Sequence, residues 1–489
     1  MVKQNIFLNP AHKKRVETQK TVASSRILML VPHEPERDPR IKWVTRLCSQ
    51  IGRTDVLGFT LTNEKPSREY DGIIYTERIK VDLLSSKLKM GIYQFFRLIQ
   101  FGSRRLRKIV YLSERFGRGS EVSKPNIDIV TVSSSHVSKP FKKEQKLELP
   151  PPVGKTITAI TRRIVSVPRF LLLFAFYYFI VDALYRRARA VSIIPRLIIC
   201  HDIYALAAGV RIKQLYHCPI IYDSHELWPE ADLEAENWEK KVTTFIERRL
   251  IRDANVVVTV TPQIARHLER LYRIKDVLIA ANAEPFNHSI TPSCDKPPSL
   301  PIKFLFQGGA TFGRGIEEFL ELWSQLKDDR AILILRAPEN DYYAYVRSRF
   351  RIEIEAGRIV ISPPVAESEL VVVASLADVG VIPYGGPSLN HVYACPNKLS
   401  QYMQAGLAIL CNADLNFVCS TVGRYECGLT YNADKPESLM ATIQSLVNAP
   451  QPLQSMKKNA YKAARSEFNW EVQSADYYKA IYNLCHNSE

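Results

Sequence analysis

Short apolar runs alternate with segments of helical spacing along most of this 489-residue sequence. The runs RLIIC at 196–200 and PIIYD at 219–223 are largely apolar, as parallel strands buried on both faces are. Residues 205–216 between them have the length and spacing of a helix. The same order begins again with IKFLFQ at 302–307 and continues to AILC at 408–411. A repeated strand–helix–strand order builds a parallel sheet with helices on both faces, so the sequence predicts two doubly wound α/β domains.

Shifts in composition set the boundaries of these domains. A polar stretch precedes the first expected strand, which reads RILMLVP. A segment with five prolines and few apolar residues lies between the two domains and is typical of a linker. We therefore predict a polar tail at 1–25, a first domain at 26–284, a linker at 285–301 and a second domain at 302–468.

The positive charge of the chain lies in its first two-fifths. The whole sequence has a net charge of +16, but residues 1–190 hold 36 Lys and Arg against 16 Asp and Glu, a net charge of +20. A one-sided basic surface favours an anionic partner, either a phosphate-rich polymer or an anionic lipid. The sequence has no helix-turn-helix, RRM or zinc-finger signature, and its basic residues alternate with aliphatic ones. We therefore expect an anionic membrane surface as partner and no nucleic acid.

Two segments within 85–195 indicate where a membrane would bind. Residues 87–112 interleave Lys and Arg with aliphatic and aromatic residues, which is a basic amphipathic pattern. Residues 170–181 are apolar on all sides of a helix and are flanked by arginines. A bilayer core needs about 20 residues of helix, so this 12-residue run does not span it. The alternative is that both segments are ordinary helices packed on the first sheet.

The N-terminal sequence and the cysteine pattern indicate the cellular compartment of the protein. The first 25 residues include Lys13, Lys14 and Arg15 and no apolar core, so no secretory signal is expected. Nine cysteines without C-x-x-C spacing predict neither a disulfide scaffold nor a zinc site. The chain is therefore expected to be cytoplasmic, with reduced thiols, and peripheral on the inner face of the membrane.

A glycine-rich turn joins a strand to a helix at 307–315, QGGATFGRG. Gly308 and Gly309 let backbone N–H groups approach a phosphate, and the following helix N-terminus favours negative charge. Arg314 can add a bidentate phosphate contact. The alternative is a tight turn that needs glycine only for its backbone conformation.

A second polar loop precedes a helix within 377–407. Proline suits the first turn of a helix, so Pro396 marks its start. Asn397 and Lys398 lie in that turn, where their donors can reach a diphosphate, and Gln401 lies one turn further, where its amide can bind a ribose diol. Asn390 lies in the loop and is included among the donor-binding residues. The alternative is a capped helix with a lysine that extends into solvent.

Histidines and carboxylates follow two strands of the first domain. His201 and Asp202 end one strand, and Asp223, His225 and Glu226 end the next. Polar residues at such ends face the ligand side of an α/β sheet. Histidine there can bind sugar hydroxyls or move a proton. The alternatives are helix capping and a metal site, but no H-x-x-x-H spacing supports metal, and none is expected.

Four stretches together resemble the family-4 retaining glycosyltransferases of the GT-B fold. They are HEPERDPRIKW at 33–43, ICHDIYAL at 199–206 with IIYDSHELWPE at 220–230, FQGGATFGRGIEEFLE at 306–321, and ADVGVIPY with SLNHVYACPNKLSQYMQAGLAI at 377–409. The resemblance implies two Rossmann-like domains that face a central cleft. It also implies that the second domain holds the nucleotide, that the first holds the acceptor, and that residues 469–489 form a helix crossing back to the first domain.

The sequence departs from the family pattern at several positions. Gly309 stands where many members have arginine, and Arg314 stands where many have lysine. Gln401 stands where the family usually has the ribose-binding glutamate, and Tyr393 stands where a second glutamate occurs in other branches. On sequence alone, Gln401→Glu is expected to keep or raise activity. Arg336 is expected partly to replace a lost phosphate contact.

The resemblance implies a retaining, metal-independent hexosyltransferase that acts in polysaccharide biosynthesis. A UDP- or GDP-linked sugar would be the co-substrate, with no other cofactor, and the acceptor would be a glycan or a lipid-linked glycan at the cytoplasmic membrane face. Arg314 and Lys398 would stabilise the leaving diphosphate, and His201 would line the sugar site. Two alternatives stay open: a weak or inactive GT-B protein that binds nucleotide-sugar or glycan in an assembly, and a sugar-nucleotide epimerase.

Overall fold

The computed structural model describes most of the two predicted domains. The described residues are 26–60, 68–70, 74–80, 174–175, 177–190, 194–233, 235–310 and 312–486. The chain divides into two units, residues 1–81 with 177–489 and residues 82–176, and the helices and strands named below belong to the first unit. The predicted tail at 1–25, the basic segment at 87–112 and the start of the apolar run at 170–181 lie outside the described residues.

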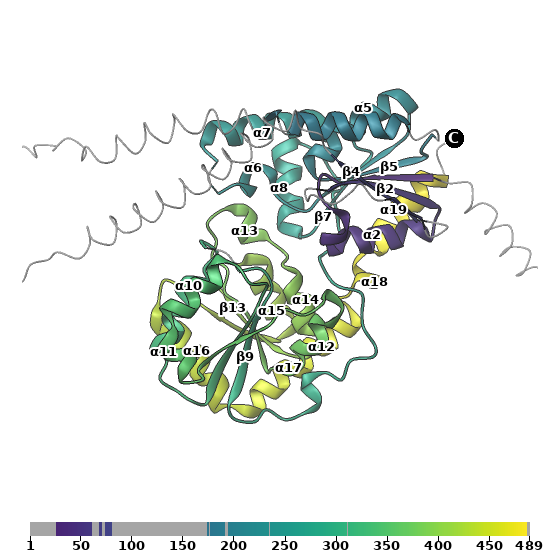
Figure 1. The fold of residues 1–489 in the computed structure, drawn as a ribbon. Helices are drawn as coiled ribbons and strands as arrows, with labels where there is room; N and C mark the ends of the chain where they lie inside the picture. The colour runs from purple at the N-terminus through teal and green to yellow at the C-terminus, as the bar shows by residue number, and fades with distance from the viewer. Residues whose placement is uncertain are drawn as a thin grey trace, which may run out of the picture. The chain divides into compact units, whose positions relative to one another are not determined.

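The first sheet joins the strands near the N-terminus to those after residue 196 (Figure 1). Its order is β3-β4-β2-β1-β5-β6-β7-β8, and the neighbouring strands are parallel except for β3 with β4. Strands β1, β5 and β6 are buried along their whole length, as their apolar runs predict. The strands are β1 (Arg26–Leu30), β2 (Arg53–Thr60), β3 (Arg68–Tyr70), β4 (Ile74–Lys80), β5 (Leu197–His201), β6 (Ile220–Ser224), β7 (Val256–Thr259) and β8 (Leu278–Ile279).

The first helix of this domain begins where the chain offers capping groups. The Asp38 side chain accepts the Arg40 N–H at 2.9 Å, and Pro39 occupies the first helical position. The helix therefore starts at Pro39. The helices are α2 (Pro39–Ser49), α5 (Asp202–Tyr216), α6 (Trp228–Ala231), α7 (Asn237–Leu250) and α8 (Pro262–Tyr272), with a further helical stretch at 177–190.

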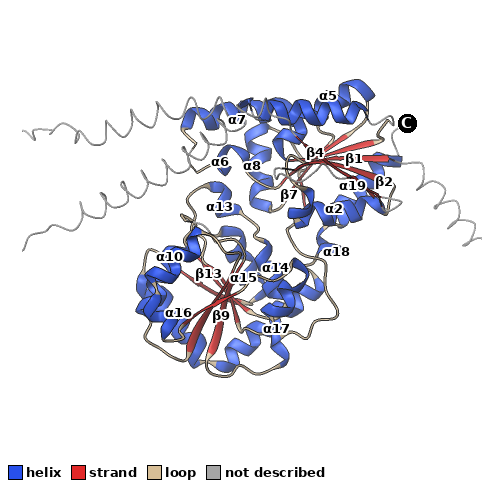
Figure 2. Cartoon of the chain, viewed as in Figure 1, coloured by secondary structure: helices blue, strands red, loops and turns tan. Residues whose placement is uncertain are grey.

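The second sheet is parallel throughout, in the order β11-β10-β9-β12-β13-β14, with helices on both of its faces (Figure 2). Its strands are β9 (Ile302–Gln307), β10 (Ala331–Arg336), β11 (Ile359–Ser362), β12 (Val379–Ile382), β13 (Ala408–Asn412) and β14 (Gly428–Tyr431). Its helices are α9 (Ile316–Gln325), α10 (Asp341–Arg349), α11 (Arg351–Glu355), α12 (Leu370–Ala374), α13 (Leu389–Tyr393), α14 (Asn397–Gln404), α15 (Asn416–Tyr425), α16 (Pro436–Asn448) and α17 (Pro450–Ser466).

Two segments connect the domains. The last helices, α18 (Trp470–Gln473) and α19 (Ala475–His486), pack on the first sheet, and Tyr477 and Ile481 are buried in its core. The proline-rich segment at 285–301 packs on the second domain: Ser293 N–H donates to the Ala405 carbonyl at 2.7 Å, and Cys294 is buried. The segment predicted as a linker is therefore fixed to the second domain over part of its length.

In each sheet the chain adds strands first on one side of the initial strand and then on the other, so the direction in which strands are added reverses at one point. In the first sheet the reversal lies between β1 and β5, and in the second it lies between β9 and β12. Ligands of doubly wound sheets bind beyond the carboxyl ends of strands at such a reversal. The loops there carry His201, the glycine loop and the segment that leads to Lys398. No helix in the described ranges is long and apolar enough to cross a membrane.

Candidate functional site

The glycine loop after β9 is held against the loop after β12. Gly315 has a φ of 83°, and a Cβ there would lie 2.5 Å from the Pro383 carbonyl oxygen and 2.6 Å from the Gly385 nitrogen. The Gly385 N–H donates to the Arg314 carbonyl at 3.2 Å. Only glycine tolerates this conformation and this approach, so Gly315 fixes the two loops together. Among the described atoms, none lies within 4 Å of a Cβ built on Gly309, so that stretch of backbone is open to a ligand.

Lys398 lies in the first turn of α14, with its ammonium beside Gly308. The side chain is buried, and a Cβ on Gly308 would lie 3.5 Å from Nζ. Nζ donates to the Tyr384 hydroxyl and lies 4.3 Å from the centre of that ring and 5.0 Å from that of Phe306. No carboxylate in the described part of the chain lies within 4 Å of Nζ. A buried ammonium without a counter-ion is costly, so this position favours an anionic ligand.

Arg336 is a second cation beside the glycine loop. It ends β10 opposite Gln307, and its carbonyl accepts the Gly308 N–H at 2.9 Å. Its Nε and Nη1 are buried and have no hydrogen-bond partner in the described structure. Burial lowers the pKa of this guanidinium. Unsatisfied donors at this place are suited to phosphate oxygens, which is the role the sequence predicted for Arg336. Arg314, within the loop itself, is exposed.

The start of α14 differs from the prediction by one residue. The helix begins at Asn397, and Pro396 precedes it as the N-cap residue. Both residues are half-buried next to Lys398. Gln401, one turn on, makes two bonds that the sequence did not predict: its Nε2 donates to Glu284 Oε1 at 2.5 Å, and its Oε1 accepts from Gln307 Nε2 at 3.2 Å.

Asn390 contacts the first domain rather than the glycine loop. Its Oδ1 accepts the Leu227 N–H at 2.8 Å, and its Nδ2 donates to the Glu226 carboxylate. Burial raises the pKa of Glu226, and the Asn390 bond opposes that rise. Both polar atoms of Asn390 are thus engaged in joining the domains, and its bonds do not support the predicted donor contact.

The predicted histidines and carboxylates of the first domain lie together. His201 Nδ1 is 3.1 Å from His225 Nε2, and Asp223 Oδ2 lies 3.6 Å and 3.5 Å from those two atoms. His201 and Asp223 are fully buried. Asp202 opens α5 with a φ of 68°, which is uncommon for a residue with a side chain, and its buried Oδ1 has no partner within the described structure. Such strain at a strand end is typical of ligand sites.

Arg40 holds this cluster in place. Its Nε and Nη2 donate to the two Asp223 oxygens at 3.1 Å and 2.8 Å. Its Nη1 donates to the Ala280 carbonyl at 2.7 Å and to Asn282 Oδ1 at 3.1 Å. The Tyr477 hydroxyl, from α19, donates to Asp223 at 3.2 Å. One guanidinium therefore ties together α2, the end of β6 and the segment after β8.

The charges of the cluster fix the protons on its histidines. Burial disfavours a charged Asp223, but Arg40 and His225 hold the pKa of its carboxyl well below the usual range. Burial lowers the pKa of His201, which is neutral at pH 7. Burial also opposes charge on His225, but Asp223 and Asp202 raise its pKa to about 9. A protonated His225 can donate to His201 Nδ1, and the other ring nitrogen of His201, Nε2, is buried without a partner among the described residues.

The same three residues have the donor atoms of a metal site. One atom each of His201, Asp223 and His225 lie within 4.8 Å of one another. However, Arg40 already binds both Asp223 oxygens, and the two histidines lie within hydrogen-bond distance of each other. We therefore interpret the cluster as a hydrogen-bonded network and not as a set of metal ligands.

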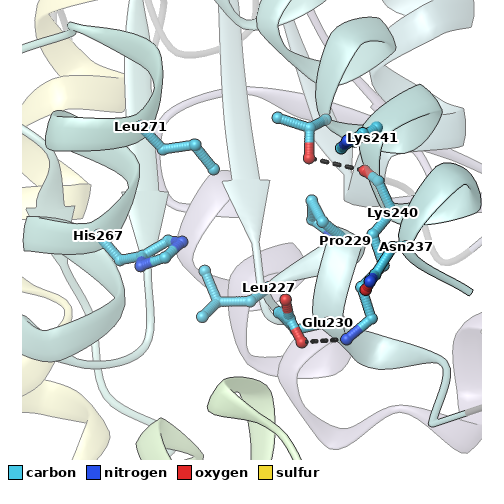
Figure 3. A pocket seen from close by; sticks show the side chains of 9 residues that line it. Leu227, Pro229, Glu230, Asn237, Lys240, Lys241, His267 and Leu271 are labelled. Atoms are coloured by element: carbon cyan, nitrogen blue, oxygen red, sulfur yellow. Dashed lines mark hydrogen bonds and ion pairs between the residues drawn. The ribbon is translucent and has the colours of Figure 1, made fainter. Parts of the chain in front are cut away.

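A hollow of about 340 Å³ lies between α6, α7 and α8, with Leu227 at the start of α6 in its wall (Figure 3). It mixes apolar and polar walls, with Leu227 and Leu271 facing across from the Asn237 and Lys240 side chains. The Lys240 ammonium is paired with Glu230 at 2.6 Å. The full lining is Leu227, Pro229, Glu230, Asn237, Lys240, Lys241, Thr244, His267 and Leu271.

Three residues of the site were not assigned a role from the sequence. Arg40 stands within the quoted DPR stretch, but nothing there indicates that it pairs with Asp223 across 183 positions. Glu284 and Tyr384 were likewise missed, because their partners Gln401 and Lys398 become neighbours only in the fold. The local signal for Tyr384 was its position directly after a predicted strand, where ligand-facing residues gather.

The sequence matches one family model. Residues 156–282 match the model described as "Glycosyl transferase 4-like domain". This agrees with the resemblance indicated by the motifs. No curated protein matches the sequence of this chain.

Solved structures match over nearly the whole chain. Sucrose-phosphate synthase from Thermosynechococcus elongatus is 15% identical with a TM-score of 0.61, and the match covers 95% of this chain and 100% of that one. A UDP-forming trehalose-phosphate synthase from Burkholderia xenovorans is 12% identical with a TM-score of 0.58, and the match covers 94% of this chain and 99% of that one. Anabaena HepE in complex with UDP is 11% identical with a TM-score of 0.56, and the match covers 93% of this chain and 99% of that one. At these identities the likeness concerns the fold, and the predicted GT-B architecture is confirmed.

Proposed function

We propose that this chain is a glycosyltransferase that moves a sugar from a nucleoside diphosphate to an acceptor hydroxyl. One observation carries the proposal: the buried Lys398 ammonium lies beside Gly308, at the reversal point of the second sheet, and has no carboxylate within 4 Å in the described structure. A diphosphate in that position supplies the missing charge. The matched glycosyl transferase 4-like model and the GT-B neighbours support this reading.

The donor is proposed to be a UDP- or GDP-linked hexose. The amides of Gly308 and Gly309, the Lys398 ammonium and the two arginines Arg314 and Arg336 would receive the phosphate oxygens. Their charges can balance the dianion that develops as the sugar leaves, so the proposed reaction does not depend on a metal ion. A structural neighbour with the same fold, Anabaena HepE, was solved in complex with UDP, which supports a nucleotide of this class.

The transfer is proposed to retain the anomeric configuration. The acceptor hydroxyl would attack the face from which the diphosphate departs, and a phosphate oxygen would take the hydroxyl proton. His201 would line the sugar site, where its Nε2–H can donate to a sugar oxygen. Fixed donors that meet developing charge need no reorganisation during the reaction, which is the main source of rate in such sites.

The acceptor is proposed to be a glycan or a lipid-linked glycan bound by the first domain. Leu227, which lines the hollow, follows His225 by two residues, so their Cα atoms lie about 7 Å apart at most. Its combination of leucines, a proline and two lysines can take both an apolar chain and hydroxyl or phosphate groups. Polysaccharide biosynthesis at the cytoplasmic membrane face is the role that this acceptor class favours.

The test is turnover with a donor panel. The purified chain is incubated with UDP- and GDP-sugars and a membrane-lipid extract, and the released nucleoside diphosphate and the anomeric configuration of the product are measured. We expect release from one donor and a product of retained configuration. Binding of a nucleotide-sugar without any release would instead favour the non-catalytic GT-B reading, and conversion of the free donor sugar would favour an epimerase.

Replacing Arg314 tests the cation within the glycine loop. Arg314→Ala should weaken binding of the nucleoside diphosphate roughly tenfold, because a charge-assisted hydrogen bond contributes about 1.5 kcal/mol or more. Since Arg314 is exposed, the loss should shrink as salt is raised. Calorimetry at low and high ionic strength measures both effects. Arg351→Ala, an exposed arginine at the start of α11, is the control and should leave the affinity unchanged.

The membrane proposal rests on exposed aromatic residues near the helix at 177–190. Phe174 and Tyr178 are 51% and 58% exposed, Phe179 is 38% exposed, and Arg186 and Arg189 are exposed further along. Aromatic rings between basic residues are suited to the interface of an anionic bilayer, where each basic residue contributes roughly 1 kcal/mol.

Liposome co-sedimentation measures this docking. Binding should require anionic lipid, fall with salt, and drop at least severalfold when Phe174, Tyr178 and Phe179 are changed to serine. The matched control changes three exposed apolar residues of the second domain, Ile352, Val372 and Leu376, to serine. Equal recovery with neutral and anionic vesicles, or equal loss in both variants, would contradict the proposal.

A further inference from the structure

A partly buried carboxylate lies next to the proposed nucleotide-binding helix and belongs to neither loop of the donor site. Glu284 follows the last strand of the first sheet, and its Oε1 accepts a bond from Gln401 Nε2 at 2.5 Å. Burial raises the pKa of Glu284 to about 7, and the Gln401 bond opposes that rise. A carboxylate can accept about four hydrogen bonds, and the described structure gives this one a single donor.

The backbone of Glu284 is fixed to α14 at two points and to the start of α18 at a third. The Glu284 N–H donates to Ser400 Oγ at 3.0 Å, and its carbonyl accepts from Gln404 Nε2 at 2.9 Å and from the Trp470 N–H at 3.2 Å. These bonds to both sides of the peptide leave the residue little freedom relative to α14. Together with the Gln401 bond to its side chain, they hold the Glu284 carboxylate beside α14.

The position of the Glu284–Gln401 pair relative to Lys398 matches the layout of a nucleotide. Gln401 lies three residues beyond Lys398, which is just under one turn of helix and roughly 4.5 Å along its axis. A ribose is joined directly to the diphosphate, so its diol reaches about one turn of helix from the phosphate site. Two adjacent hydroxyls need acceptors, and a carboxylate provides them better than an amide does.

Building on the proposed function, we infer that Glu284 is a specificity residue that binds the ribose diol of the donor nucleotide, with Gln401 orienting its carboxylate. The charge at this subsite comes from the segment that leaves the first domain, while α14 contributes the amide. The chain therefore recognises a ribonucleotide and discriminates against its deoxy analogues.

This pairing reverses the expectation for Gln401→Glu. A glutamate at 401 would lie against the Glu284 carboxylate, where the amide now donates. Two like charges at that distance in a partly buried site repel each other, so one of them is favoured to take up a proton. The substitution should therefore weaken nucleotide binding, whereas the exchange Gln401→Glu with Glu284→Gln keeps one carboxylate and one amide.

Calorimetry with the full chain tests the inference. The probes are UDP and GDP, the 2′-deoxy and 3′-deoxy forms of whichever binds more tightly, and inorganic diphosphate. The native chain should bind the ribonucleotide roughly tenfold or more tightly than either deoxy form, because a hydrogen bond to a charged group is being lost. Glu284→Ala should remove that discrimination, leave diphosphate affinity unchanged and lower nucleotide affinity to the deoxy level.

Two further variants and a control test recognition of the ribose, and thermal unfolding separates this effect from a loss of stability. Gln401→Glu should lose at least tenfold in ribonucleotide affinity, and the double exchange should regain most of it. Glu367→Gln is the control. The charge of Glu367 raises the pKa of Glu284, but its carboxylate pairs with Lys42 and not with Gln401. This variant should leave the discrimination unchanged, and thermal unfolding confirms that each variant is folded.

The outcomes also separate this inference from the proposed function. Tight ribonucleotide binding with equal affinity for the deoxy forms, or discrimination that survives in Glu284→Ala, would overturn the role of Glu284 and leave the donor site standing. Absence of any nucleotide or diphosphate binding would overturn both.

Discussion

Lys398→Ala is expected to reduce turnover by about 10²- to 10³-fold and to weaken nucleoside diphosphate binding by about tenfold or more. The ammonium is buried beside Gly308, and its described partners are a neutral hydroxyl and two aromatic rings. It therefore has no structural counter-ion to stabilise, and its charge is available to the ligand. The effect on turnover should exceed that on binding, because charge accumulates on the diphosphate as the sugar departs.

The design separates charge from packing. Lys398→Met keeps the aliphatic stem against Tyr384 and Phe306 but removes the charge, so it should lose as much as the alanine variant. Lys303→Ala is the matched control, because Lys303 is exposed on β9, the strand that leads into the glycine loop. Calorimetry and released diphosphate are the measurements. Native affinity in both Lys398 variants would show that the diphosphate binds elsewhere.

Arg40→Met is expected to lower the free energy of unfolding by about 3–5 kcal/mol, the usual loss when one partner of a buried ion pair is removed. Asp223 is fully buried and receives two bonds from Arg40, so the substitution leaves an uncompensated carboxylate. It also leaves the Ala280 carbonyl without its donor. Urea unfolding followed by tryptophan fluorescence measures the change.

Two comparisons make this prediction specific. Arg40→Met with Asp223→Asn should recover part of the loss, because the unpaired charge is gone. Arg330→Met removes a guanidinium that also binds both oxygens of an aspartate, Asp328, but at the surface, and it should change stability little. A loss no larger in Arg40→Met than in Arg330→Met would mean that the buried pair is not what joins α2 to the sheet.

The architecture of this protein could be predicted from its sequence because it is encoded locally. Strands such as β1 and β5 are continuous apolar runs, and helices between strands have their own spacing and, at α2, a capping group, Asp38 before Pro39. The glycines at 308 and 315 predict a turn that needs positive φ, and the proline at 396 predicts the start of a helix. These signals act within a few residues, so the order of elements and the position of the glycine loop follow from them.

The partners of the site residues were decided only by the tertiary structure. The sequence placed Gln401 in a ribose subsite and suggested that a glutamate would improve it, but Glu284 lies against its amide, 117 positions away. It placed Asn390 in the donor site, but the fold turns both of its polar atoms to Glu226 and Leu227. It indicated His201, Asp223 and His225 without the guanidinium of Arg40 that orders them.

The physical reason is the range of the interactions. Strand and helix formation depend on neighbours in sequence, whereas a hydrogen bond or an ion pair depends on a few ångströms between groups that the chain brings together from any separation. Parallel sheets gather the ends of strands that are far apart in sequence. The sequence therefore determined which side chains reach the ligand end of each sheet, and the tertiary structure decided which of them touch, which carry a proton and which stay free for a substrate.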